Sequence, residues 1–189
     1  AKEAEQMVAL ARSKGLFLME AMWTRFFPIV RKLRELTASG ALGSPRCIQA
    51  DFGFIGPTDP SHRVMDLNMA GGAMLDIGIY LVQLATMFFG STMPEVTSTG
   101  ILTTTKVDQE GSLSLCWKDT GSASLLFTLR ANTPENSVIM FDGGYVRIHG
   151  PAHCPERMTV FRAKERGKFV EEDFHFPLPK LKDGEETGP

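Results

Sequence analysis

The chain has 189 residues, about one and a quarter domains at the usual domain size. Hydrophobic residues make up 43% and charged residues 22%, a composition typical of globular proteins that excludes an intrinsically disordered chain. The net charge of −2 offers no basic surface to nucleic acid or anionic lipid, and the apolar runs are shorter than the roughly 20 residues of a membrane span. We therefore expect neither a nucleic-acid partner nor a membrane partner.

The three cysteines, Cys47, Cys116 and Cys154, are an odd number and form no CxxC pair. This pattern argues against a disulfide framework or a zinc ribbon, and with no signal peptide it predicts a cytoplasmic protein. His149, His153 and Cys154 are close in sequence but lack a fourth ligand at a standard zinc spacing. We therefore predict no metal site.

The first 23 residues predict a helix followed by a strand. Apolar residues recur at helical spacing over residues 1–14, and a nearly continuous apolar run follows over residues 16–23. Such a run is typical of a strand buried on both faces of a parallel sheet. We interpret 1–23 as a remnant of a dinucleotide-binding domain, the last helix and strand of a Rossmann-like unit whose partner strands lie outside this sequence.

The next segments alternate between helix and strand. Pro28 suits the first turn of a second helix, and Gly40 suits its end. Apolar residues at every second position over 47–54 predict a half-buried strand. A long polar loop over 56–70, longer than most connections and so a candidate functional segment, leads to the most apolar predicted helix, 73–89.

Beyond residue 90 the hydrophobic pattern has a period of two almost throughout. It predicts strands over 95–105, 112–118, 122–130, 137–141, 144–149, 157–162 and 169–176. The predicted fold class is α+β, in which residues 24–176 form a substrate-binding and dimerisation domain with a largely antiparallel open sheet packed on helices. The proline-, glycine- and acid-rich residues 177–189 are predicted to be a disordered tail.

The predicted helix 73–89 carries the sharpest functional signal. Asp76, Tyr80 and Gln83 follow one another at i, i+4 and i+7, so they share one stripe of an otherwise apolar helix. A buried carboxylate and phenol need polar partners, because unpaired polar groups are costly in a protein interior. The stripe is therefore either the wet wall of a pocket or part of an internal hydrogen-bond network, and the residues alone leave both open.

Two motifs resemble a known family. EAMWTRFFP at 20–28 and GGAMLDIGIY at 71–80, in the order helix, strand, helix, strand, loop and GG-helix, are similar to the Gfo/Idh/MocA family of NAD(P)-dependent oxidoreductases. The resemblance covers nearly the whole chain. Many members have His where this chain has Tyr80, and the tyrosine points to the branch that acts on dihydrodiols, xylose or glucose and fructose.

The resemblance implies roles for five residues. Tyr80 would be the catalytic acid/base, Asp76 would help place the substrate alcohol, and Trp23 and Phe52 would line the substrate pocket. Arg25 would lie near the nicotinamide or the substrate, although a surface ion pair explains it equally well. The implied reaction transfers a hydride to NADP from a secondary alcohol, in a trans-dihydrodiol, in an aldopentose such as D-xylose, or in the substrate of another sugar dehydrogenase.

The chain also departs from the family pattern. It contains no G-x-G-x-x-G sequence and no Glu-Lys-Pro motif, whose lysine would assist the tyrosine, and the final helix of the family is missing. His153 stands where close relatives have an aromatic residue before Cys-Pro. We therefore expect an inactive fragment of a dehydrogenase that forms a homodimer through the open sheet face. The alternative is a non-enzymatic assembly module that keeps the Asp76–Tyr80 stripe only as structure.

Overall fold

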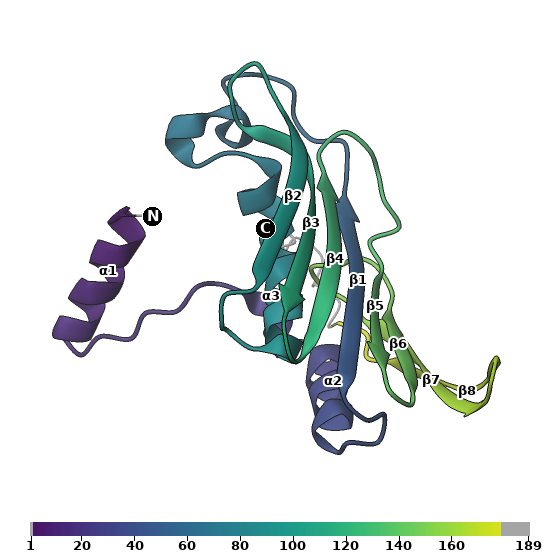
Figure 1. Cartoon of the computed structure of the whole chain (residues 1–189). Coiled ribbons are helices and arrows are strands. Elements are labelled where there is room, and N and C mark those ends of the chain that lie inside the picture. Colours follow the sequence, from purple (N-terminus) through teal and green to yellow (C-terminus); the bar gives the residue numbers. More distant parts are fainter. Residues whose placement is uncertain (1, 179–189) are drawn as a thin grey trace.

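A computed structural model describes residues 2–178 and shows one large sheet with helices against one of its faces (Figure 1). The helices are α1 (Lys2–Ser13), α2 (Pro28–Ala38) and α3 (Ile79–Phe89). The strands are β1 (Pro45–Gly53), β2 (Glu95–Leu102), β3 (Asp108–Trp117), β4 (Gly121–Thr128), β5 (Ser137–Phe141), β6 (Gly144–Ile148), β7 (Arg157–Glu165) and β8 (Lys168–His175). The predicted α+β class and its strands after residue 90 are confirmed.

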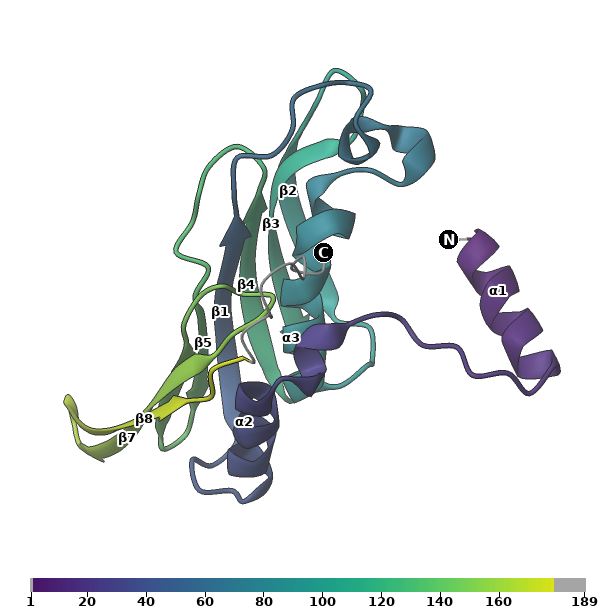
Figure 2. The same cartoon turned by 180° about the vertical axis from the view of Figure 1, so that it is seen from behind.

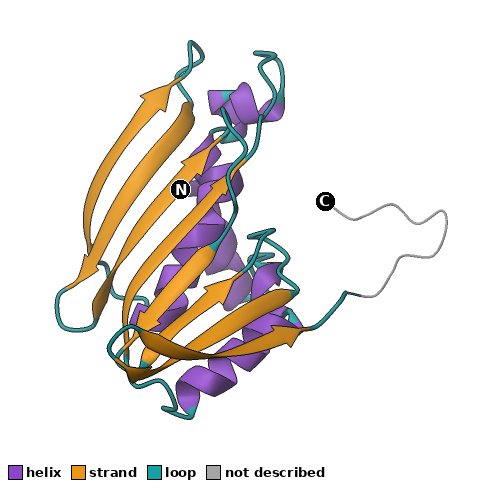
Figure 3. Ribbon diagram, turned by 90° about the vertical axis from the view of Figure 1, so that its right-hand side faces the viewer, coloured by secondary structure: helices purple, strands orange, loops and turns teal. Residues whose placement is uncertain are grey.

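The eight strands lie in the order β2-β3-β4-β1-β5-β6-β7-β8. Neighbouring strands are antiparallel except β1 and β4, which run parallel with Ile48 beside Ala123. The first strand thus enters the middle of the sheet, between two antiparallel meanders. Figure 3 shows the helices on one side of the twisted sheet and none on the other, as predicted for an open sheet.

The core lies between the covered face of the sheet and helices α2 and α3. Along β4, Ala123, Leu125 and Phe127 are buried toward the helices, whereas Ser124 and Leu126 between them are exposed on the open face. This alternation is what a strand with one covered face requires, since successive side chains point to opposite faces. The period-two pattern in the sequence therefore indicates which face of the sheet the helices cover.

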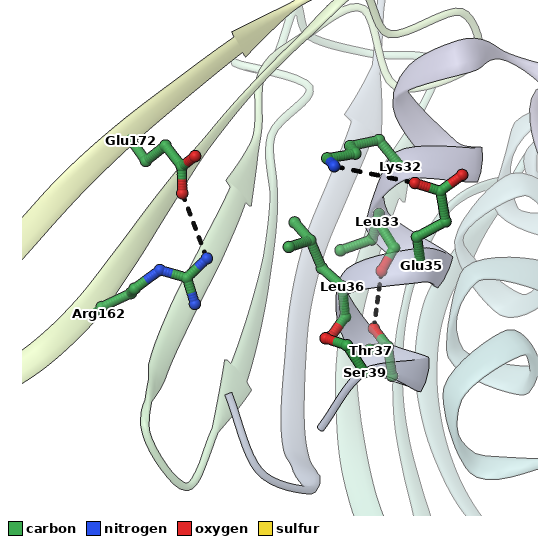
Figure 4. A network of polar contacts seen from close by, with 8 residues as sticks. All are labelled: Lys32, Leu33, Glu35, Leu36, Thr37, Ser39, Arg162 and Glu172. Carbon is green, nitrogen blue, oxygen red and sulfur yellow. Dashed lines mark hydrogen bonds and ion pairs between the residues drawn. The ribbon is translucent and has the colours of Figure 1, made fainter. Parts of the chain in front are cut away.

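Helix α2 begins at Pro28, whose missing N–H costs nothing in the first turn, and buries Ile29, Val30 and Leu33. In its last turn the Thr37 hydroxyl donates to the Leu33 carbonyl oxygen at 2.9 Å (Figure 4). The figure also shows two exposed ion pairs, Lys32–Glu35 on α2 and Arg162–Glu172 between β7 and β8. Exposed pairs of this kind stabilise by about 0–1 kcal/mol each, so the buried apolar face anchors the helix.

The predicted helix 73–89 is present but has two parts, a π-helical segment over Met74–Gly78 and the α-helix α3. The longer segment Leu67–Phe89 has the length and mean hydropathy of a membrane span, yet half of its most apolar window is buried inside the protein. Leu81, Leu84 and Ala85 pack within the core against the sheet. Packing against the sheet therefore accounts for the apolar character of this helix.

The N-terminal segment contains the predicted helix, whereas the strand predicted after it depends on partners outside this sequence. Helix α1 is present, although it buries no residue, and Figures 1 and 2 show it standing away from the sheet. The strand predicted over 16–23 needs partner strands outside this sequence: residues 16–22 belong to no helix or strand and pair with no strand among residues 2–178, and Phe17 is 87% exposed. A strand needs neighbours for its backbone hydrogen bonds, and no strand among residues 2–178 lies beside this one.

At the other end of the chain, β8 ends at His175. The predicted disordered tail, residues 177–189, lies outside the described residues apart from its first two positions, which belong to no helix or strand.

Candidate functional site

The π-helical segment and α3 together position Asp76 and Tyr80. The wider π turn carries Asp76, whose backbone N–H donates to the Gly72 carbonyl oxygen at 3.1 Å, and α3 then carries Tyr80 in its first turn. Single turns of π-helix occur frequently at functional sites, because they change the direction of side chains along a helix. Both side chains are partly buried and open into the same cavity, which favours the pocket over a purely internal network.

This cavity has a volume of about 590 Å³ and is bounded by residues from five regions of the chain. Its lining residues are Ala21, Trp23, Phe52, Phe54, Arg63, Asp76, Ile77, Tyr80 and His153. The sequence predictions for Trp23, Phe52, Asp76 and Tyr80 thus converge on one place, although these residues come from the N-terminal connection, β1 and the helix. A cavity with an aromatic wall and a few convergent polar groups is typical of a small-molecule site.

The hydroxyl of Tyr80 is oriented by Trp23. The indole Nε1–H donates to the Tyr80 hydroxyl oxygen at 3.1 Å. An indole N–H is only a donor, so the phenol accepts in this bond and its own O–H remains available to another group. Phe52, which is 4% exposed, holds the tyrosine ring edge to face with centroids 5.7 Å apart. The phenol is therefore fixed by packing on one side and by a hydrogen bond on the other.

Asp76 is paired with a residue that the sequence analysis did not select. The guanidinium Nη2 of Arg63 donates to Asp76 Oδ1 at 2.9 Å, and the exposed fractions of the two side chains are 67% and 19%. The second carboxylate oxygen and the remaining guanidinium N–H groups are left for other partners. Arg63 lies in the long loop that was predicted to be functional, but nothing in the sequence singled it out from the other polar residues there.

His153 also lines the cavity, next to Phe52. Its ring is stacked on Phe52 with centroids 5.3 Å apart and an interplanar angle of 9°. Burial lowers the pKa of His153 below its ordinary value and raises the pKa of the Cys154 thiol. Both side chains are therefore uncharged at neutral pH.

Two other residues singled out in the sequence do not line the cavity. Gln83 is buried behind Tyr80, and Arg25 is exposed on the 3₁₀ turn Trp23–Phe26. Among residues 2–178 no group of three or more histidine, cysteine or acidic side chains is placed to hold a metal ion. His149 instead lies 2.8 Å from the Thr159 hydroxyl, a contact within the sheet.

Residues 30–151 match the family model described as the GFO/IDH/MocA C-terminal domain. The chain belongs to this family. The matched residues include the helix that carries Asp76 and Tyr80 and most strands of the sheet, so the chain is compared with other members of this family.

Among the relatives are mammalian proteins named trans-1,2-dihydrobenzene-1,2-diol dehydrogenase. The pig protein is 39% identical over 182 residues, which cover 95% of this chain and 50% of the relative. The human protein is 38% identical over 184 residues, which cover 96% of this chain and 51% of the relative. The chain thus spans about half the length of the relatives it matches.

Solved structures share the fold. An aldose-aldose oxidoreductase from Caulobacter crescentus, complexed with glycerol, superposes with a TM-score of 0.77 at 24% identity, covering 93% of this chain and 53% of that one. KijD10, a 3-ketoreductase from Actinomadura kijaniata in complex with NADP and TDP-benzene, superposes with a TM-score of 0.72 at 24% identity, covering 93% and 54%. At this identity the likeness concerns the fold alone.

Proposed function

We propose that the chain is the substrate-binding half of an NADP-dependent dehydrogenase that oxidises a secondary alcohol, with Tyr80 as the acid/base. The observation that carries this proposal is the tyrosine hydroxyl held by Trp23 in a cavity that also contains Asp76. Dehydrogenases among the relatives support the reaction class. Their name supports a trans-dihydrodiol as substrate, and the aldose-aldose oxidoreductase among the structural neighbours supports an aldose such as D-xylose.

In this mechanism each side chain of the cavity has a separate role toward the substrate alcohol. The phenolate form of Tyr80 takes the hydroxyl proton as the carbon–hydrogen bond breaks, its own proton having passed to a basic group outside this sequence. In the reverse direction the Tyr80 O–H returns the proton. The free oxygen of Asp76 accepts a hydrogen bond from a neighbouring hydroxyl, and its bond to Arg63 fixes the direction of the carboxylate. Trp23 and Phe52 form the wall against which the carbon skeleton rests.

NADP, when bound, accepts the hydride that leaves the alcohol carbon. The cavity fits the reacting end of such a cofactor, because it is lined by aromatic rings and places a phenol O–H at a hydrogen-bonding position. Arg25, exposed on the turn that follows Trp23, is a candidate contact to the nicotinamide end. The sequence holds no G-x-G-x-x-G turn for the pyrophosphate, so we propose that a dinucleotide-binding domain outside this sequence supplies it.

The test of the catalytic assignment uses the only two tyrosines in the chain. In a version joined to an upstream dinucleotide-binding domain, Tyr80→Phe is expected to lower kcat by about 10²–10⁴-fold, the usual contribution of a positioned acid/base. Tyr145→Phe is the matched control, because Tyr145 stacks on Phe161 of β7 outside the cavity and its loss leaves the site unchanged. Retained turnover after Tyr80→Phe would refute the assignment, whereas a substantial loss of stability with no site formed would favour the assembly module.

The fragment hypothesis gives a separate expectation for residues 1–189 alone. We expect no NADP-dependent oxidation of D-xylose or of a trans-dihydrodiol by the purified chain, measured as NADPH absorbance. Turnover by this chain would show that it holds a complete active site.

We also propose that the open sheet face pairs with a second copy of this chain. Its central side chains are polar, uncharged and in register, with Gln49, Ser124 and Ser114 side by side on β1, β4 and β3. Leu126 on this face is 42% exposed. Ser124→Arg is expected to convert a dimer to a monomer in analytical ultracentrifugation, because it places a charge in the centre of the contact. Ser91→Arg, on an exposed turn, is the control and leaves the mass unchanged.

A further inference from the structure

Three aromatic rings surround His153. It is stacked on Phe52, and it lies against Tyr80 and Trp23 with ring centroids 6.2 Å and 6.0 Å away. The imidazole thus lies in the wall of the cavity beside both the acid/base and its hydrogen-bond donor. Packing alone does not account for an imidazole here, because a phenyl ring would stack on Phe52 in the same way.

The position of the ring is set by the backbone on both sides. The Thr24 hydroxyl, on the residue after Trp23, donates to the His153 carbonyl oxygen, and Thr24 is 5% exposed. The Ala152 N–H donates to Glu135 Oε2 at 3.0 Å. The first bond joins the loop that follows β6 to the turn that carries Trp23, and the second joins the same loop to the one before β5. The two residues on either side of the cavity are therefore positioned together, as a binding site requires.

The nitrogens of His153 have a hydrogen-bonding capacity that the described residues do not use. Nδ1 is buried and has no partner among residues 2–178. A neutral imidazole offers one donor and one acceptor, and burial keeps this one neutral by lowering its pKa. Nδ1 is enclosed by protein atoms, so the nitrogen open to a ligand in the cavity is Nε2, which is not buried and makes no hydrogen bond among the described residues. Polar atoms in a protein interior are nearly always paired, so an imidazole in a cavity wall whose two nitrogens both lack partners indicates a missing partner.

We propose that His153 is a specificity-determining residue that makes this cavity select a polyhydroxylated substrate, such as an aldose, over an aromatic dihydrodiol. The inference rests on the proposed function and names the substrate class for the same site. A dihydrodiol has two adjacent hydroxyls, which Tyr80 and Asp76 engage, and its remaining surface is hydrocarbon. A sugar ring carries further hydroxyls around an apolar face of C–H groups.

The chemistry of the wall matches the sugar better. The C–H face of a sugar ring lies well against Phe52 and Trp23, while one of its outer hydroxyls bonds the imidazole. A hydrocarbon at the same place would exclude water from the imidazole and leave its nitrogen without a hydrogen-bond partner. Sites built to bond a hydroxyl reject analogues that lack it more strongly than apolar sites reject an added hydroxyl. His153 therefore favours the sugar and penalises the aromatic diol.

The test compares two probes on the purified chain 1–189. D-xylose and trans-1,2-dihydrobenzene-1,2-diol are titrated while the fluorescence of Trp23 is followed; Trp117 is 5% exposed and gives a constant background. His153→Phe keeps the stacked ring but removes both nitrogens. We expect it to weaken D-xylose binding by about tenfold or more and to change diol binding by less than about twofold, or to strengthen it.

Two further variants make the result specific. His175→Phe makes the same chemical change at an exposed position on β8 and is expected to leave both affinities unchanged. His153→Gln restores a donor and an acceptor without the ring, so it is expected to bind D-xylose better than His153→Phe does. It also tests the inference if the phenylalanine variant does not fold. In a histidine NMR spectrum, the signal missing from His153→Phe is the one that D-xylose should shift.

The outcomes separate this inference from the proposed function. Equal D-xylose affinity of the wild-type chain and His153→Phe, with the diol bound by both, would overturn the role of His153 and leave the dehydrogenase proposal standing. Binding of neither probe by the wild-type chain would overturn the inference, whereas the proposed function is overturned separately, by retained turnover after Tyr80→Phe in the joined protein.

Discussion

The two most apolar stretches of the chain differ in how far they are exposed to solvent. Residues 16–22 and the helix over 74–89 are both apolar enough to predict burial, yet Leu16 is 66% exposed and Leu81 is 1% exposed. The helix lies against a sheet made by the same chain, whereas the N-terminal stretch has no neighbouring strand among the described residues. The difference shows that hydrophobicity predicts a need for burial and does not say which surface will meet it.

The largest expected effect tests this contrast directly with one substitution in each region. Leu33 on α2 is fully buried, so Leu33→Ala should lower the free energy of unfolding by about 2–5 kcal/mol through lost burial and a residual cavity. Leu16→Ala makes the same change at an exposed site and should alter it by less than about 0.5 kcal/mol. Urea denaturation measures both values. Comparable losses in the two variants would mean that residues 16–22 pack against a surface in solution.

A smaller effect is expected at Thr24, which follows the N-terminal stretch and joins it to the loop that carries His153. Thr24 is buried and its hydroxyl holds the loop of His153, so Thr24→Val keeps the shape but leaves a carbonyl oxygen unpaired. We expect a loss of about 1–2 kcal/mol in the free energy of unfolding. Thr97→Val on the exposed edge strand β2 is the control and should be close to neutral. If both variants behaved alike, the junction would not depend on this bond.

The smallest effect concerns pH. Burial is the main cause that lowers the pKa of His153 and of His149, so the unfolded chain binds protons more readily than the folded one. Stability should therefore be complete above the ordinary histidine pKa of 6.5 and fall as the pH drops below it. In urea denaturation between about pH 7.5 and 5.5, His153→Phe should show a smaller fall than the wild-type chain. An equal fall in both would assign the effect to His149 or to other groups.

Much of the fold could be predicted from the sequence because its signals are local. The period-two pattern after residue 90 marks the covered face of each strand, and Pro28 and Gly40 bracket α2 closely. The i, i+4 spacing of Asp76 and Tyr80 predicted one shared stripe, and both side chains line one cavity, although the π-helical turn that carries Asp76 left no recognisable signal in the sequence. Gln83 continued the same stripe but is buried behind the cavity.

The remaining site residues depend on contacts between distant parts of the chain. Arg63 reaches Asp76 from a loop that contains other polar residues with no such partner, and no spacing rule distinguishes it. His153 was recognised only as a change in the pocket wall; its stacking on Phe52 joins residues about a hundred positions apart. Such contacts follow from strand order, and strand order is a property of the whole sheet.

Length and composition predicted somewhat more than one domain, and the sequence by itself determined the α+β class, the strands of the sheet and the family resemblance. The tertiary structure decided that β1 lies in the middle of the sheet, that the N-terminal apolar stretch has no neighbouring strand among residues 2–178, and that Arg63 and His153 complete the cavity. The physical reason is that periodicity encodes which side of an element is apolar, whereas the partner of that side is chosen only when all the elements pack together.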